Sequence, residues 1–144
     1  MIEIVAEVDD ERFALVEKGL EEFNAERSAA LRAVHGLPDD GEEPLQVYAL
    51  EDGVLVGGIT GKTWAGWLHI ELMWVAEEQR RAGLGGRLLR RAEEVARERG
   101  CTHSRVESWG FQAPEFYQGQ GYTVFGVLEG YPAGETEYLL SKPL

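Results

Sequence analysis

A glycine-rich segment, Arg80-Arg81-Ala82-Gly83-Leu84-Gly85-Gly86, has the residue types and spacing best suited to binding a charged ligand. It follows an apolar stretch that ends at Val75, and it opens a stretch with helical periodicity. The start of a helix presents unpaired backbone N–H groups and the positive end of the helix dipole, so it attracts an anion. Glycines let the backbone approach a phosphate without an intervening side chain. The segment therefore predicts a phosphate-binding site.

Two common phosphate-binding motifs do not fit this segment. A dinucleotide-binding Gly-x-Gly-x-x-Gly motif would need glycine at position 88, where Leu88 stands. A Walker A motif would need Gly-Lys-Ser or Gly-Lys-Thr, and neither is present. These mismatches disfavour a Rossmann-like nucleotide-binding protein.

The pattern Arg-x-x-Gly-x-Gly, from Arg80 to Gly85, resembles the pyrophosphate-binding motif of the GNAT superfamily of acyl-CoA-dependent N-acetyltransferases. A second stretch, APEFYQGQGY at residues 113–122, is similar to the family signature that ends in Tyr-x-x-x-Gly-aromatic. The apolar strand ends at Val75, five residues before the first motif, as is usual in the family. The resemblance covers about residues 45–142.

This resemblance implies acetyl-CoA as the co-substrate, in a gap between the strands expected at residues 70–75 and 101–108. The implied cofactor-binding residues are Met73, Trp74, Val75, Arg80, Arg81, Ala82, Gly83, Leu84, Gly85 and Gly86. The first three would pair with pantetheine through their backbone, and the others would hold the pyrophosphate. Arg80 or Arg87 could add charge-assisted contacts to the phosphates. No metal is implied, and three scattered histidines do not suggest a structural zinc site.

The resemblance also implies direct attack of an amine on the thioester within a ternary complex. A backbone N–H near Val75 would stabilise the oxyanion. Tyr117 matches the tyrosine that protonates the coenzyme A sulfur, and a phenol remains protonated near neutral pH. The alternative for Tyr117 is packing in the core beside Phe116.

Three residues are candidates for the base that takes a proton from the amine. Side chains alternate along Trp67–Val75, which places His69, Glu71 and Met73 on one face unless a bulge changes the register. Glu71 is the first choice, and His69 stands where some family members carry a catalytic glutamate. Glu107, at the end of the next strand, is the third. Each could instead be a hydrogen-bonded or solvated side chain.

The elements that must position these residues follow from the hydrophobic pattern. Periodicity predicts a strand at 2–8, a helical region at 9–34, strands at 45–50, 54–61 and 67–75, a helix at 83–99, a strand at 101–108, a short helix at 113–119, and strands at 122–128 and 136–140. A break in the first helical region is expected near Gly19 or Asn24. We expect an α/β (α+β) fold with a mixed, mostly antiparallel sheet of six to seven strands, one central parallel crossover and helices on both faces. Residues 1–144 would form a single N-acetyltransferase domain.

The charge composition indicates which classes of binding partner to expect. The chain has 14 Lys and Arg against 26 Asp and Glu, so nucleic-acid binding is not expected. Eighteen of the acidic residues precede residue 80, on the part that contributes much of the acceptor side in the family, which favours a cationic acceptor. We expect the primary amine of a small molecule or peptide. Neither a secretory signal nor a membrane span is visible, so the expected location is cytoplasmic.

Two points stay open from the sequence. A non-catalytic acyl-CoA-binding or sensing module would keep the glycine-rich segment and lose turnover. The loop at residues 131–134 either closes over the acceptor or forms a homodimer contact.

Overall fold

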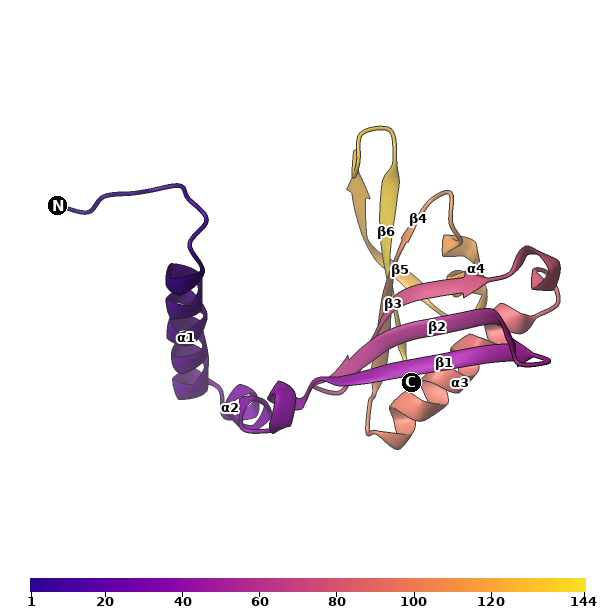
Figure 1. The fold of residues 1–144 in the computed structure, drawn as a ribbon, viewed down its shortest axis with the longest axis horizontal. Coiled ribbons are helices and arrows are strands. Elements are labelled where there is room, and N and C mark those ends of the chain that lie inside the picture. Colours follow the sequence, from indigo (N-terminus) through magenta and orange to yellow (C-terminus); the bar gives the residue numbers. More distant parts are fainter. The chain divides into compact units, whose positions relative to one another are not determined.

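The computed structural model describes all residues from Met1 to Leu144 and places them in two units, Met1–Gly41 and Glu42–Leu144 (Figure 1). None of its helices has both the length and the apolar character that a membrane crossing requires. The single domain expected over residues 1–144 stays a prediction, and each unit is described by itself.

The first unit is helical. Its elements are α1 (Asp10–Arg27), α2 (Ala29–His35) and the 3₁₀ helix η1 (Pro38–Gly41). Asp9 caps α1, since its Oδ1 accepts a hydrogen bond from the Arg12 N–H at 2.9 Å. The strand expected at residues 2–8 is wrong, because residues 1–9 have no regular secondary structure. A strand needs a hydrogen-bonded neighbour, and this unit contains no other strand.

The break between the two helices lies at Ser28, and not near Gly19 or Asn24 as expected. Ser28 is extended, with φ −132°, and its Oγ accepts a hydrogen bond from the Leu31 N–H at 3.1 Å. A serine at this position ends one helix and caps the next. The glycine and the asparagine are tolerated inside α1.

The second unit contains one six-stranded sheet. Its strands are β1 (Glu43–Glu51), β2 (Val54–Trp64), β3 (Trp67–Val75), β4 (His103–Trp109), β5 (Thr123–Glu129) and β6 (Thr136–Pro143). The spatial order is β1-β2-β3-β4-β6-β5, and every neighbouring pair is antiparallel except β3 and β4, which are parallel. The expected mixed sheet with one central parallel crossover is confirmed.

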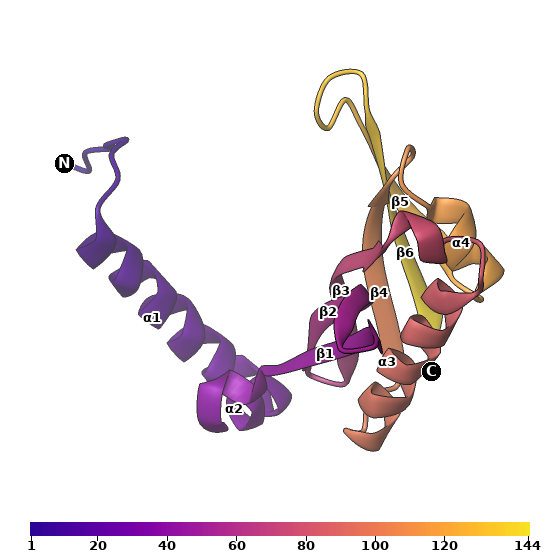
Figure 2. The same ribbon diagram turned by 45° about the vertical axis from the view of Figure 1, so that its right-hand side comes forward.

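Helices α3 (Leu84–Glu98) and α4 (Pro114–Gly119) pack on one face of this sheet, called here the core face (Figure 2). The 3₁₀ helix η2 (Glu77–Gln79) links β3 to the segment before α3. The core combines one stripe of α3 with inward-facing strand residues and α4, namely Leu45, Ile59, Leu68, Ile70, Leu88, Leu89, Ala92, Ala96, Val106, Tyr117, Tyr122 and Leu140. This unit leaves the opposite face of the sheet, called here the outer face, without a helix of its own. The helix expected on that face stays a prediction.

A bulge in β3 changes which side chains share a face. Thr60 of β2 pairs with Leu72, whereas Gly61 pairs with Ile70, so Glu71 has no partner. Gly61 is required there, since a Cβ atom would lie 2.0 Å from the His69 carbonyl oxygen.

Because of this extra residue, Met73 and Val75 pack against the core like Leu68 and Ile70, while His69 stays on the outer face. The alternation expected in the absence of a bulge, with Met73 on one face with His69 and Glu71, therefore does not hold, and the condition stated for a bulge applies. The bulge adds one residue and reverses the alternation beyond it.

A buried ionic network joins α3 to the end of the sheet. Glu93, whose side chain is 3% exposed, accepts two hydrogen bonds of 3.0 Å from the Lys142 ammonium. The Tyr122 hydroxyl lies 2.9 Å from Glu93 and 2.8 Å from Ser104. The carboxylate is thus neutralised and hydrogen-bonded away from water, as a buried charge requires.

We expect Lys142→Met to lower the free energy of unfolding by about 3 kcal/mol, because it leaves the Glu93 carboxylate buried without its cation. Denaturant unfolding measures this change. The double variant Glu93→Gln/Lys142→Met should recover much of the loss, since it buries no charge. Equal losses in the single and the double variant would contradict the explanation. Lys18→Met, at an exposed helix position, is the control.

Candidate active site

The parallel strands β3 and β4 are paired over only part of their length. Trp67–Ile70 pairs with His103–Val106. Beyond these residues β3 continues to Val75 and β4 continues to Trp109, but the two strands no longer pair with each other. On the side that faces β4, the edge of β3 is therefore unpaired from the bulge at Glu71 to the end of the strand. The gap expected for pantetheine lies between these ends of the two strands.

The glycine-rich segment lies directly beyond β3 and η2. Arg81 and Gly83 both have left-handed backbones, with φ 66° and 79°, and Gly83 is the N-cap of α3. No backbone or side-chain acceptor takes a hydrogen bond from the N–H groups of residues 81–86. Successive N–H groups in such a turn at a helix start form a concave anion-binding site. The predicted phosphate-binding site thus has free backbone N–H groups, and phosphate binding there stays a prediction.

The glycines in this segment have different roles. A Cβ atom on Gly83 would meet nothing within 4 Å, so this position is open to a ligand. A Cβ atom on Gly85 would lie 3.1 Å from the Met73 methyl group and 3.5 Å from the Phe116 ring. Gly85 therefore allows α3 to pack against β3 and α4, a role different from the phosphate approach expected from the sequence.

Two arginines expected near the phosphates already have protein surroundings. Arg80 donates a hydrogen bond from Nε to the Val75 carbonyl oxygen at 3.1 Å, which joins the glycine-rich segment to the end of β3. Arg87 lines a cavity of about 460 Å³ between α3 and the β1–β2 hairpin, together with Leu84 and Gln79. Arg80 therefore stabilises the position of the glycine-rich segment relative to β3.

Tyr117 of α4 reaches the gap from the core face. It is 6% exposed, and its hydroxyl lies 3.5 Å from the Met73 sulfur. Its ring packs edge-on against Phe116 and Tyr122, at centroid distances of 5.1 and 5.6 Å. Burial raises the pKa of Tyr117 to about 12. The ring is part of the core and the hydroxyl lies against Met73, beside the unpaired part of β3. The role of Tyr117 as proton donor stays a prediction.

The three candidates for the base are not equivalent. His69 Nε2 lies 2.8 Å from Glu107 Oε2, so these two are brought together on the outer face. Glu71, the first choice from the sequence, is the bulged residue; its side chain is exposed, and its charge helps to raise the pKa of Lys62 on β2. Sequence reasoning missed Arg105, which donates to the other Glu107 oxygen at 3.0 Å. Its position two residues before Glu107 on one strand was the available signal.

The loop between β5 and β6 is held by a hydrogen bond to the end of β4. The Trp109 indole N–H at the end of β4 donates to the Tyr131 carbonyl oxygen at 2.6 Å, and the two rings stack. The β5–β6 loop is thereby held against the C-terminal end of β4. This places residues 131–134 at the same end of the sheet as the gap.

Comparison with known proteins agrees with this arrangement. The acetyltransferase (GNAT) family matches residues 7–122, well over half of the chain. The chain belongs to this family. Blasticidin-S acetyltransferase of Streptomyces morookaense is 48% identical over 130 residues, which cover 87% of this chain and 96% of that relative. The protein is therefore an acetyltransferase.

Solved structures show the same fold. A crystal structure of an acetyltransferase from Bacillus cereus ATCC 14579 aligns with a TM-score of 0.81 and 29% identity, covering 99% of this chain and 98% of that one. The PaiA N-acetyltransferase of Thermoplasma acidophilum, solved with coenzyme A, aligns with a TM-score of 0.63 and 21% identity over 71% of this chain and 62% of that one.

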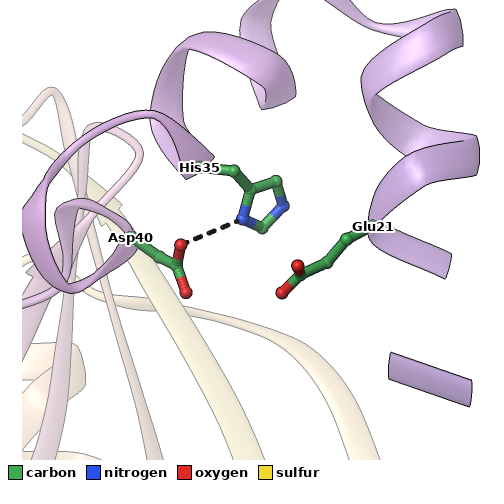
Figure 3. A group of neighbouring side chains, drawn as sticks. All are labelled: Glu21, His35 and Asp40. Carbon is green, nitrogen blue, oxygen red and sulfur yellow. Dashed lines mark ion pairs between the residues drawn. The ribbon is translucent and has the colours of Figure 1, made fainter. Parts of the chain in front are cut away.

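A second cluster of polar side chains lies in the first unit of the acetyltransferase. Glu21, His35 and Asp40 each offer one ligand atom, and these atoms lie within 4.8 Å of one another (Figure 3). His35 Nδ1 is 3.6 Å from Asp40 Oδ1. Three donors are fewer than the four that a structural zinc site uses, and two of these residues are exposed. The cluster alone does not identify a metal centre.

We expect Tyr117, the candidate proton donor, to stay protonated in alkaline solution. Because the pKa of Tyr117 is raised to about 12, this phenol stays protonated at pH values where an exposed tyrosine ionises. At saturating substrates, kcat should show no loss from Tyr117 ionisation up to about pH 10. A fall of kcat between pH 8 and 10 that is present in the wild type and absent in Tyr117→Phe would contradict this prediction.

Proposed function

We propose that this acetyltransferase transfers the acetyl group of acetyl-CoA to a primary amine of a small molecule, by direct attack in a ternary complex. The observation that carries the proposal is the set of unpaired N–H groups at residues 81–86, which lies beside the unpaired end of β3. These amides suit a diphosphate, and the strand edge suits an extended arm with amide groups. The PaiA protein, solved with coenzyme A, has the same fold.

The residues of this chain then have defined tasks. The amides of Arg81 to Gly86 hold the diphosphate, and the backbone of Met73 to Val75 pairs with the pantetheine arm. A backbone N–H near Val75 stabilises the oxyanion of the tetrahedral intermediate. Tyr117 donates its proton to the departing sulfur from the core face, where its hydroxyl already lies against Met73.

Small-molecule antibiotics are the acceptor class with the best support. The relative that is 48% identical is a blasticidin-S acetyltransferase, and that similarity spans almost its whole length. We therefore propose blasticidin S as the first acceptor to test. Amino-terminal peptides represent the other acceptor class expected from the sequence.

The test is an acceptor panel with purified protein and acetyl-CoA. Free thiol release and product mass report transfer, and blasticidin S should give a product heavier by one acetyl group. Transfer to peptides alone would overturn the antibiotic assignment. Binding of acetyl-CoA without thiol release for any amine would favour the non-catalytic binding module.

We also propose that the transfer needs no metal ion. Each group assigned a task above is a backbone amide or a tyrosine hydroxyl of this chain. Treatment with EDTA should therefore leave kcat unchanged. A loss of activity that added Zn²⁺ restores would contradict this proposal. A cytoplasmic location and a homodimer contact at residues 131–134 also stay predictions.

A further inference from the structure

A buried carboxylate at the start of β6 has no partner. Glu137 is only 9% exposed, yet its side chain makes no hydrogen bond or ion pair. Glu93, the other buried acid, is paired with Lys142 and Tyr122. Neither oxygen of Glu137 is fully enclosed, so both can be reached by another molecule. Because an unpaired buried carboxylate is unfavourable, Glu137 is suited to a cation that the chain does not supply.

The pairing of the strands places Glu137 close to the gap. Glu137 lies directly opposite Trp109 of β4 and opposite Leu128 of β5. Ser108 is buried in the core, so Trp109 is on the outer face, and directly opposite residues of antiparallel strands share a face. Trp109 is two residues, or about 7 Å, beyond Glu107, the first residue at which β3 and β4 part. A small molecule whose amine lies in the gap can therefore extend to Glu137.

Aromatic rings gather around Trp109. Its ring stacks with those of Tyr131 and Phe111, at centroid distances of 6.4 and 6.2 Å. The hydrogen bond from the Trp109 indole to the Tyr131 carbonyl oxygen holds this arrangement, and the Trp109 backbone N–H donates to Gln112 at 2.8 Å. Tyr131 is nevertheless 54% exposed and Phe111 is 68% exposed. Fixed, exposed ring faces attract cations.

One chemical group satisfies both features. A guanidinium forms two parallel hydrogen bonds with a carboxylate, and its flat shape also stacks on aromatic rings. An ammonium pairs with the carboxylate but cannot stack in this way. A neutral or apolar group would contact the rings and leave Glu137 unpaired.

We propose that Glu137 and the rings of Trp109 and Tyr131 bind a second group of the acceptor, a planar cation such as a guanidinium, distinct from the amine that is acetylated. The proposal rests on the proposed acetyl transfer and names the class of acceptor: an amine that carries a guanidinium at a distance of about 7 Å or more.

The test uses 4-guanidinobutylamine and its urea analogue, which has the same shape without the charge on the flat group. Each compound competes with the acceptor found in the panel, at saturating acetyl-CoA. The guanidine should inhibit about tenfold to a hundredfold more strongly than the urea, because only the guanidine pairs its charge with Glu137. The compound 1,5-diaminopentane, with an ammonium in place of the guanidinium, should inhibit less strongly than the guanidine.

Two variants assign the effect to these side chains. Glu137→Gln keeps the shape and should raise the inhibition constant of the guanidine to that of the urea, with acetyl-CoA affinity unchanged. Tyr131→Leu should raise the inhibition constant of the guanidine by about twofold to fivefold. Glu129→Gln is the matched control, since it removes an exposed acid from the opposite face of β5, next to Leu128.

The melting temperature gives a readout that does not depend on activity. Without ligand, Glu137→Gln should unfold at the same temperature as the wild type or at a higher one, because it loses no contact and buries no charge. Adding 4-guanidinobutylamine should raise the melting temperature of the wild type but not that of Glu137→Gln.

Several results would overturn the proposal while leaving acetyl transfer intact. Equal inhibition by the guanidine and the urea would do so, as would an unchanged preference in Glu137→Gln. Inhibition by the diamine as strong as that by the guanidine would contradict a planar cation. A lower melting temperature of ligand-free Glu137→Gln would show that Glu137 has a partner within the protein. Absence of transfer in the wild type with every acceptor would instead refute the proposed function, and the melting temperatures would still show whether Glu137 binds the cation.

Discussion

Tyr117→Phe is expected to lower kcat by about 10²- to 10⁴-fold while acetyl-CoA affinity stays the same. The substitution removes the hydroxyl that would protonate the departing sulfur. It keeps the ring that packs against Phe116 and Tyr122. The only hydrogen bond of that hydroxyl is the 3.5 Å contact with Met73, so the fold should lose little stability. Steady-state kinetics and calorimetric titration with acetyl-CoA measure the two effects.

Tyr122→Phe is the matched control. Its hydroxyl is equally buried but bonds to Glu93 and Ser104, away from the gap. It should therefore destabilise the protein by about 1–3 kcal/mol and change kcat little. If Tyr117→Phe retained the wild-type rate, Tyr117 would be a packing residue only.

Gly83→Asp is expected to weaken acetyl-CoA binding by about tenfold to a hundredfold. Gly83 faces open space at the N-cap of α3, so a carboxylate there would repel the diphosphate and compete for the same N–H groups. Aspartate tolerates the left-handed backbone better than most residues and suits a helix start, so the fold should persist. Calorimetric titration with acetyl-CoA at two salt concentrations measures the loss, which should shrink at high salt.

Two controls separate charge from backbone strain. Gly83→Asn has nearly the same shape without the charge and should keep most of the affinity. Gly53→Asp places the same carboxylate at another left-handed, open glycine, in the β1–β2 turn. If the asparagine and aspartate variants at position 83 lost affinity equally, repulsion of a bound anion would not be the cause.

The sequence predicts an element well where its pattern is local. The strand Trp67–Val75 has the bounds expected from its apolar run. The expected strand at residues 2–8 depended on a distant partner that alternation alone cannot reveal. The break lies at Ser28 because its side chain accepts a hydrogen bond from the Leu31 N–H and so caps α2. Gly19 and Asn24 make no such bond and stay inside α1.

The site shows the same division. Motif spacing located the unpaired N–H groups and Tyr117, since both depend on residues close in the sequence. The bulge that moves Met73 to the core face was foreseen only as a condition, because it depends on Gly61 in the neighbouring strand. The contact between His69 and Glu107 joins residues 38 apart, and only the parallel register brings them together.

The central claim is that backbone amides at the start of α3 hold the diphosphate while the thioester lies where β3 and β4 part. A crystal structure of the protein with acetyl-CoA tests it most directly. We expect the diphosphate within hydrogen-bond distance of the N–H groups of residues 81–86 and the thioester between Met73 and Glu107. A coenzyme bound elsewhere, or a gap filled by side chains in the complex, would contradict the account.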